Sequence, residues 1–386
     1  MYTKIIEGKI ETTRLFNEFF NSEKAGGIVL VLATIVSIVL ANSKLGNTYI
    51  EIWNYDLGGH SLVHWINDGL MTIFFLLIGL ELEREFYEGE LSNLRTALLP
   101  VFSALGGMII PAGIFIALNY GKETIAGTGI PMATDIAFAI GILSLLGSRV
   151  PASLKIFLTA LAIFDDLGAI ILIAVFYTAT LLYANLLIAL GIFFLLIILN
   201  RLGVRNLIPY LVLGILMWYF TLHSGVHASI AGVLLAFVVP YGEVEEKSPS
   251  DILQHHLHKP VAFIILPLFA LANTCIVLGG NWYTGLDQPL SLGIIAGLVI
   301  GKPLGIALFS LLAVALGLCA LPYDMKWKNV IGAGMLGGIG FTMSIFIAIV
   351  GLDNGLMIDK AKIAILVASI ISGIAGYFWL RVSLPK

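Results

Sequence analysis

The chain has 386 residues, of which 59% are hydrophobic and only 12% are charged, and its mean hydropathy is +0.99. A soluble domain of this composition would expose more apolar surface than soluble proteins tolerate, so the composition excludes a soluble enzyme. The net charge of −3 gives no sign of nucleic-acid binding, and we expect an integral membrane protein.

Apolar stretches long enough to cross a bilayer recur from Gly26 to the C-terminus and are separated by short polar loops. They predict one all-α transmembrane domain over residues 1–386 that needs no cofactor. The expected spans, about twelve in number, are 25–43, 64–86, 96–118, 126–147, 153–178, 182–200, 206–221, 224–240, 260–280, 291–317, 328–350 and 361–381.

The loop after the first span has the pattern of a hairpin. Apolar and polar residues alternate through Tyr49, Glu51 and Trp53, and the turn signal Asp56-Leu-Gly-Gly59 follows. We therefore expect an external hairpin over residues 47–62, whose edge could pair with a second copy in a homodimer. An ordinary solvated loop is an equal alternative.

The distribution of basic residues predicts the topology. An even number of spans puts both termini on one side, and most Lys and Arg residues fall on that side. Lys44, Lys122, Lys360 and Lys362 lie opposite, and Lys302 lies within the membrane. The positive-inside rule therefore places both termini in the cytoplasm.

Two spans contain residues that interrupt a helix. Each is the middle member of a three-span set, at residues 96–178 and 291–381, and the opposite orientations of the two sets predict an inverted repeat. Paired interrupted helices indicate a transport site near the midplane, although glycines also serve close helix packing. The interrupting residues are Gly127, Gly129 and Pro131 in the fourth span, and Gly337, Gly338 and Gly340 in the eleventh.

Four ionisable residues are expected inside the membrane: Asp135, Asp165, Asp166 and Lys302. An acid at the centre of a membrane helix costs about 3 kcal/mol, so the adjacent pair should face water, an ion or a partner charge. Neighbouring helical residues point about 100° apart, which predicts different roles for Asp165 and Asp166. One should face the ion pathway and the other should pair with Lys302, unless all of these charges only neutralise one another.

The chemistry of the acidic pair favours cation exchange. Carboxylate oxygens bind hard cations such as Na⁺, and burial favours the protonated carboxyl, so Na⁺ and H⁺ would compete for Asp165 and Asp166. A site that binds either ion and opens to one side at a time is an antiporter. The alternatives are a passive cation channel and an intramembrane aspartyl protease, but the protease needs a Gly-x-Gly-Asp motif that is missing from the sequence.

Four motifs together resemble the NhaA-type sodium/proton antiporters over essentially the whole chain. The rule about paired interrupted helices was itself drawn partly from this family, so it gives no independent support. The motifs are Ala133-Thr-Asp135, Ala162-Ile-Phe-Asp-Asp-Leu-Gly168, Gly301-Lys-Pro303 and Gly337-Gly-Ile-Gly-Phe-Thr-Met-Ser344.

The resemblance implies a non-enzymatic transporter of the bacterial inner membrane that exports Na⁺, and also Li⁺, for protons in sodium and pH homeostasis. Exchange would be electrogenic. By the resemblance, Asp165 and Asp166 bind the ion, Thr134 and Asp135 line the broken helix, and Lys302 supports the assembly. It also implies a pH response, although Gln254 stands where the family has an acid; the residues implied are Glu81, Arg84, Glu85, His227, His255 and His258.

Overall fold

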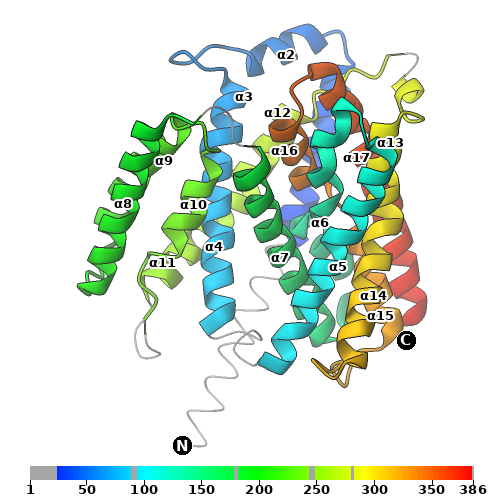
Figure 1. Ribbon diagram of the computed structural model, residues 1–386. Helices are drawn as coiled ribbons and strands as arrows, with labels where there is room; N and C mark the ends of the chain where they lie inside the picture. Colours follow the sequence, from blue (N-terminus) through cyan, green and yellow to red (C-terminus); the bar gives the residue numbers. More distant parts are fainter. Residues whose placement is uncertain (1–23, 88–93, 178–180, 243–247, 280–281, 385–386) are drawn as a thin grey trace, which may run out of the picture.

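The protein is all-helical in the computed structural model, which describes residues 24–87, 94–177, 181–242, 248–279 and 282–384 (Figure 1). Residues 178 and 280, the expected ends of two spans, lie outside these ranges. The helices are Lys24–Ala41, α2 Gly46–Trp53, α3 Leu62–His64, η1 Trp65–Leu70, α4 Met71–Tyr87, α5 Leu94–Asn119, η3 Glu123–Met132, α6 Ile136–Ser144, η4 Gly147–Arg149, α7 Ala152–Phe176, α8 Tyr183–Arg201, α9 Leu207–Leu222, α10 Ser229–Ala236, α11 Pro249–Pro260, η5 Val261–Ile265, α12 Leu266–Asn273, η6 Trp282–Gly285, α13 Pro289–Ala296, η7 Gly297–Gly301, α14 Lys302–Ala315, α15 Trp327–Gly337, α16 Phe341–Gly351 and α17 Gly355–Ser383.

The described residues include nine helices that are long and apolar enough to cross a bilayer, and the bent pair α15 and α16 makes a tenth span. The polytopic all-α fold is therefore as predicted. The expected span 206–221 corresponds to α9, which has 16 residues, whereas the expected span 224–240 corresponds to the shorter helix α10, which has only 8. Gly225 adopts a positive φ of 86° between them, which ends α9 and delays the start of α10.

Both predicted helix interruptions are present. In the fourth span, the 3-10 segment η3 carries Gly127, Gly129 and Pro131, and the chain is extended from Ala133 to Asp135 before α6 begins. In the eleventh span, α15 and α16 are bent by 47° across the glycine-rich junction. The two breaks touch, since the Asp135 amide donates to the Ile339 carbonyl at 2.6 Å.

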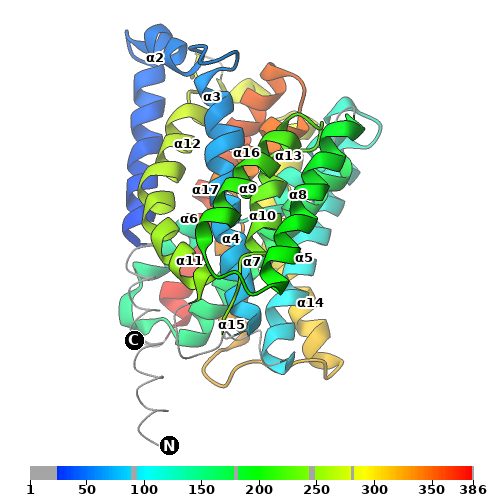
Figure 2. The same cartoon turned by 90° about the vertical axis from the view of Figure 1, so that its left-hand side faces the viewer.

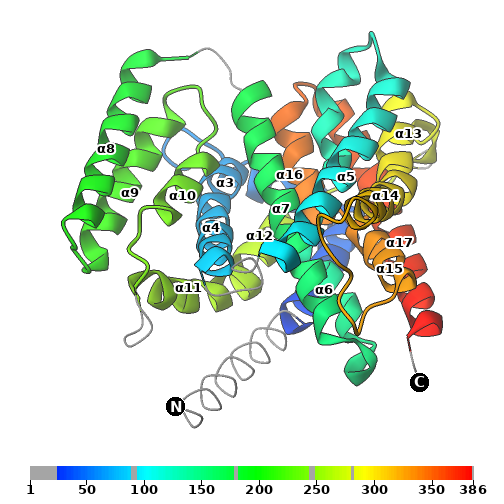
Figure 3. The same cartoon turned by 60° about the horizontal axis from the view of Figure 1, so that its bottom comes forward.

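The helices form two groups that share α4 and α7 between them. Figure 3 shows α8, α9 and α10 on one side and α5, α13, α14 and α17 on the other. The larger hydrophobic core surrounds the crossing of the two broken helices, whereas a smaller core joins α8, α9 and α10 to α4. In both expected sets, residues 96–178 and 291–381, a broken helix stands between two continuous ones, as predicted. The inverted repeat that would relate the two sets stays a prediction.

Close packing of α5 against α14 depends on two glycines. A Cβ added to Gly305 would collide with the carbonyl oxygen of Gly106, and a Cβ added to Gly106 would collide with the carbonyl oxygen of Gly305. Gly305→Ala should therefore lower the free energy of unfolding by about 1–3 kcal/mol, measured by thermal unfolding in detergent. Gly191→Ala on α8 has open space around its Cβ and is the control. Equal melting temperatures for the two variants would refute the packing argument.

The prediction of an external hairpin over residues 47–62 is wrong for most of that loop. Residues Gly46–Trp53 form α2 (Figure 2), and strand-like pairing is limited to one antiparallel bridge between Asp56 and Ser61. The turn itself is as expected, with positive φ at Gly58 and Gly59. Because helical backbone has no free sheet edge, the hairpin edge expected to pair with a second copy is replaced by α2.

Candidate functional site

The acidic pair lies in the middle of α7, and its side chains are fully buried. Asp165, Asp166 and Lys302 each have 0% of their surface exposed. Lys302 is the first residue of α14, directly after the π-helical turn Gly297–Gly301, and Thr134 lies in the break before α6. The structure therefore brings residues from three predicted spans together where the broken helices cross.

Lys302 forms the predicted ion pair with one member of the acidic pair. Its ammonium group donates to the Asp165 carboxylate and, at 3.0 Å, to the Thr134 hydroxyl. That hydroxyl lies 2.6 Å from Asp165 Oδ2 and 2.8 Å from the Gly337 carbonyl, and it can donate its single proton to either. Asp165 thus has a partner charge, and Thr134 connects the pair to the broken helix.

Asp166 has a different environment, as the angle between adjacent helical residues predicted. Neither of its carboxylate oxygens has a hydrogen-bond partner among the described residues, and Asp165 Oδ1 is also unsatisfied. Three acids, Asp165, Asp135 and Glu81, and one base, Lys302, are near enough to act on Asp166 electrostatically. A buried carboxylate without a partner is costly unless it holds a proton or a cation, so this group is suited to take up either.

Asp135 stabilises the crossing from between the two broken helices. Its Oδ1 accepts from the Phe138 amide at 3.0 Å, which caps α6. Its Oδ2 accepts from the Thr342 amide at 2.9 Å and from the Thr342 hydroxyl at 2.6 Å, at the start of α16. A carboxylate at a helix N-terminus is stabilised by the helix dipole, and Asp135 receives this contribution from two helices.

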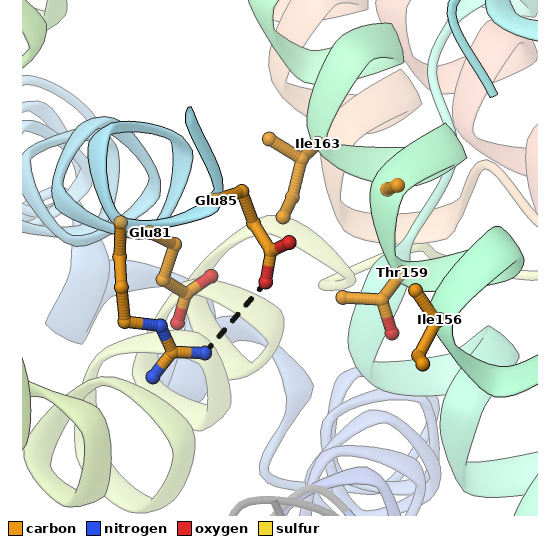
Figure 4. Close-up of a pocket in the computed structure, with 7 residues that line it drawn as sticks. Glu81, Glu85, Ile156, Thr159 and Ile163 are labelled. Carbon is orange, nitrogen blue, oxygen red and sulfur yellow. Dashed lines mark ion pairs between the residues drawn. The ribbon is translucent and has the colours of Figure 1, made fainter. Parts of the chain in front are cut away.

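A small cavity lies between α4 and α7 (Figure 4). Its volume of about 30 Å³ is enough for a water molecule. In Figure 4 the Glu81 and Glu85 side chains come from α4 and face Thr159 and Ile163 on α7. Ile163 precedes Asp166 by one helical turn, so the cavity points along the face of α7 that carries Asp166.

Comparison with known proteins identifies the family of the chain. The family described as Na⁺/H⁺ antiporter 1 matches residues 17–380. The chain belongs to this antiporter family. Relatives named Na⁺/H⁺ antiporter NhaA occur in Flavobacterium psychrophilum, with 63% identity over 96% of this chain and 97% of the relative, and in Cytophaga hutchinsonii, with 58% identity over 98% and 97%. The NhaA of Shewanella pealeana is 48% identical over 97% of this chain and 98% of the relative.

In the present chain, most of the residues implied in the pH response lie at one end of the bundle. Glu81 and His258 line a second small cavity, between α4 and η5, which brings together two segments far apart in the sequence. The Arg84 guanidinium lies 3.8 Å from Glu85 Oε1, in a partly exposed pair. His255 is exposed on α11, outside that cavity.

His227 does not join that group. It lies at the other end of the fold, where its Nε2 is 3.5 Å from Asp68 Oδ1 and its Nδ1 is 2.9 Å from the Ser229 hydroxyl. His64 Nδ1 approaches the same carboxylate at 3.1 Å. Asp68 was not predicted from the sequence. The predicted site contained only acids expected deep in apolar runs, and Asp68 lies near the start of its span.

A second acid of the antiporter was missed on α4. Glu83 is only 7% exposed and accepts a hydrogen bond from the Ser250 hydroxyl at 3.0 Å. Gln254 is also buried, one helical turn after Ser250. The only signal in the sequence was the density of acids in Glu81-Leu-Glu83-Arg-Glu85, which does not say which of them is buried.

Proposed function

We propose that the protein is a secondary antiporter that exports Na⁺ in exchange for H⁺, with Asp166 as the principal ion-binding group. The observation that carries this assignment is the Asp166 carboxylate, which is completely buried and has no hydrogen-bond partner among the described residues. Membership of the antiporter family and relatives named Na⁺/H⁺ antiporter NhaA support the exchange activity. The chemistry of the carboxylate supports the two ions.

Competition for one site produces the exchange. A protonated Asp166 is neutral and stable in its buried position, whereas the ionised form needs a cation such as Na⁺ close to its oxygens. The free Oδ1 of Asp165 is the second available acceptor. Because the two ions cannot occupy the same oxygens together, release of protons on one side is coupled to uptake of Na⁺ there.

The Asp165–Lys302 pair gives the site a second titratable element. When Na⁺ binds to the Asp165 carboxylate, it weakens the attraction between that carboxylate and Lys302, and this attraction keeps the buried Lys302 charged. Lys302 is therefore the group that would release a further proton. Release of more than one proton for each Na⁺ makes exchange electrogenic. Thr134 would support this step, since its hydroxyl accepts from Lys302 and can donate to Asp165.

The broken helices supply the element that moves. Interrupted helices carry their dipole ends into the membrane, and here Asp135 caps two N-termini at the point where they meet. Motion of one three-helix set against the other would open the acidic pair first to one side and then to the other. All the groups involved belong to one chain, so exchange does not require a second copy.

Two rival functions fit the geometry less well. An aspartyl protease needs two acids that face each other from different helices and share a proton, but Asp165 and Asp166 are neighbours on α7, and Asp165 is paired with Lys302. A passive channel would not need a buried, proton-titrating acid or two broken helices. We therefore propose no enzymatic activity.

The orientation in the membrane, the regulation by pH and the transport of Li⁺ are further parts of the proposal. The excess of basic residues supports cytoplasmic termini in a bacterial inner membrane. The cavity shared by Glu81 and His258 supports regulation by pH, since histidine titrates near neutrality and Glu81 acts electrostatically on Asp166. Li⁺ should be transported with Na⁺, as another small hard cation that suits carboxylate oxygens.

The test is Na⁺-driven proton movement in acid-loaded proteoliposomes. Adding Na⁺ or Li⁺ outside should raise the internal pH, whereas K⁺ and choline should give only the response of protein-free vesicles. The same assay repeated across pH would reveal regulation as a change in rate. An equal response to all four cations, or none at any pH, would overturn the proposal.

A further inference from the structure

An apolar groove runs along the outside of the bundle, and it is much larger than the two small cavities beside Glu81. Its volume of about 500 Å³ lies in the range of small-molecule binding pockets, which is about 300–1,000 Å³. The walls come from the helix Lys24–Ala41, α6 and α17. The residues that line it include Val31 and Thr34, Phe138 and Ile142, and Ile374 and Phe378.

The lining determines which occupant suits the groove. Its side chains are almost entirely aliphatic or aromatic, and the outward-facing Ile35, Ile370 and Phe378 are 52%, 60% and 56% exposed. In a protein that spans a bilayer, such a surface faces lipid, so hydrocarbon is the medium that fills the groove. A groove lined in this way fits an acyl chain and offers almost nothing to a polar ligand.

Each of the three walls of the groove carries a basic residue toward the same end. The helix Lys24–Ala41 begins there with Lys24, two helical turns before Val31 on the same face. Arg149 follows the end of α6, and Arg381 lies one turn after Tyr377 on the lining face of α17. All three side chains are exposed.

We propose that this groove binds one acidic phospholipid, with an acyl chain between the three helices and the phosphate near Lys24, Arg149 and Arg381. Basic pockets between membrane helices bind acidic headgroups because positive charge is concentrated at the depth of the phosphates. The apolar lining provides the hydrophobic contribution, and the basic residues provide selectivity for an anionic headgroup.

The groove also reaches the crossing of the broken helices. Phe341, the first residue of α16, forms part of its floor, and its ring lies 4.8 Å from the ring of Phe138 on α6. The Phe341 amide donates to the Ser369 hydroxyl at 3.2 Å, and Ser369 lines the groove from α17. An acyl chain in the groove therefore packs against both broken helices, next to Asp135.

Native mass spectrometry of the purified full chain tests the site, with phosphatidylglycerol and zwitterionic phosphatidylcholine as probes. The variant K24Q/R149Q/R381Q should bind phosphatidylglycerol at least fivefold more weakly than wild type. The control variant K44Q/K122Q/K360Q loses the same charge at the opposite end of the bundle and should bind like wild type. A second variant, V31W/I374W, fills the groove and should lose the tightly bound phospholipid.

The outcomes separate the proposal from general lipid adhesion. Equal loss of phosphatidylglycerol in both triple variants, or equal retention of both probes by wild type, would overturn it. If the K24Q/R149Q/R381Q variant does not fold, Arg381→Gln alone takes its place, and wild-type affinity in that variant would refute the headgroup contact. Undiminished binding in V31W/I374W would refute the acyl-chain position.

Discussion

Asp166→Asn is expected to abolish Na⁺-dependent proton exchange and to leave the protein folded. Asparagine has nearly the same shape but can neither release a proton nor supply an anionic oxygen to Na⁺. The rate of internal alkalinisation in acid-loaded proteoliposomes should therefore fall to that of protein-free vesicles. Because the native carboxylate is buried with no hydrogen-bond partner among the residues that the structure describes, the melting temperature should be unchanged or higher.

The matched control is Asp353→Asn, which makes the same chemical change at an exposed position after α16. It should transport at the wild-type rate. Exchange near the wild-type rate in Asp166→Asn would show that the ion is bound elsewhere. A large loss of thermal stability in that variant would instead indicate a structural role for the carboxylate.

Most of the fold could be predicted from the sequence, because length and hydropathy determine where a chain can cross a membrane. The two breaks were predictable for a similar reason: Pro131 and the glycines around Gly338 weaken the helical hydrogen-bond ladder. The position of a break was harder to predict. In the fourth span the chain becomes extended only after Pro131, where Asp135 can cap α6 and accept from α16 at the same time.

The loop before α3 shows where pattern reasoning failed. Alternation in Tyr49, Glu51 and Trp53 suggested a strand, but it also fits a helix that packs one face on its neighbours. Tyr49 decides between them, since its hydroxyl donates to the Leu271 carbonyl at 2.9 Å and its ring packs edge-on against Trp53. Leu271 is far away in the sequence, so this contact could not be predicted.

More of the central site than of its surroundings could be predicted from the sequence. The pairing of Lys302 followed from charge alone, because it was the only basic residue expected within the membrane. Which acid it would contact did not follow from spacing, and the structure assigns Asp165. The surroundings of Asp68 and Glu83 depend on contacts with distant helices: the Trp218 indole on α9 donates to the Asp68 carbonyl, and the Ser250 hydroxyl on α11 donates to Glu83. These contacts have no signal in the local sequence.

Lys302→Met should lower the free energy of unfolding by about 3–5 kcal/mol and stop exchange. Removing one partner of a buried ion pair leaves the other charge uncompensated, and Asp165 is completely buried. Methionine retains much of the length of the lysine side chain, so a cavity contributes little to the effect. Thermal unfolding in detergent and the proteoliposome assay measure the two losses separately.

The double variant K302M/D165N distinguishes the ion pair from simple packing. Once Asp165 is neutral, the loss of Lys302 no longer leaves the charge of Asp165 uncompensated, so the double variant should recover stability that Lys302→Met loses. For two residues in direct contact, the double-mutant cycle should give a coupling energy at the upper end of about 0.5–3 kcal/mol. Exchange should stay absent, because transport needs the titratable pair that stability can do without. Additive losses of stability in the two single variants would show that Lys302 stabilises the protein through packing, and its assigned role in proton release would then have no basis.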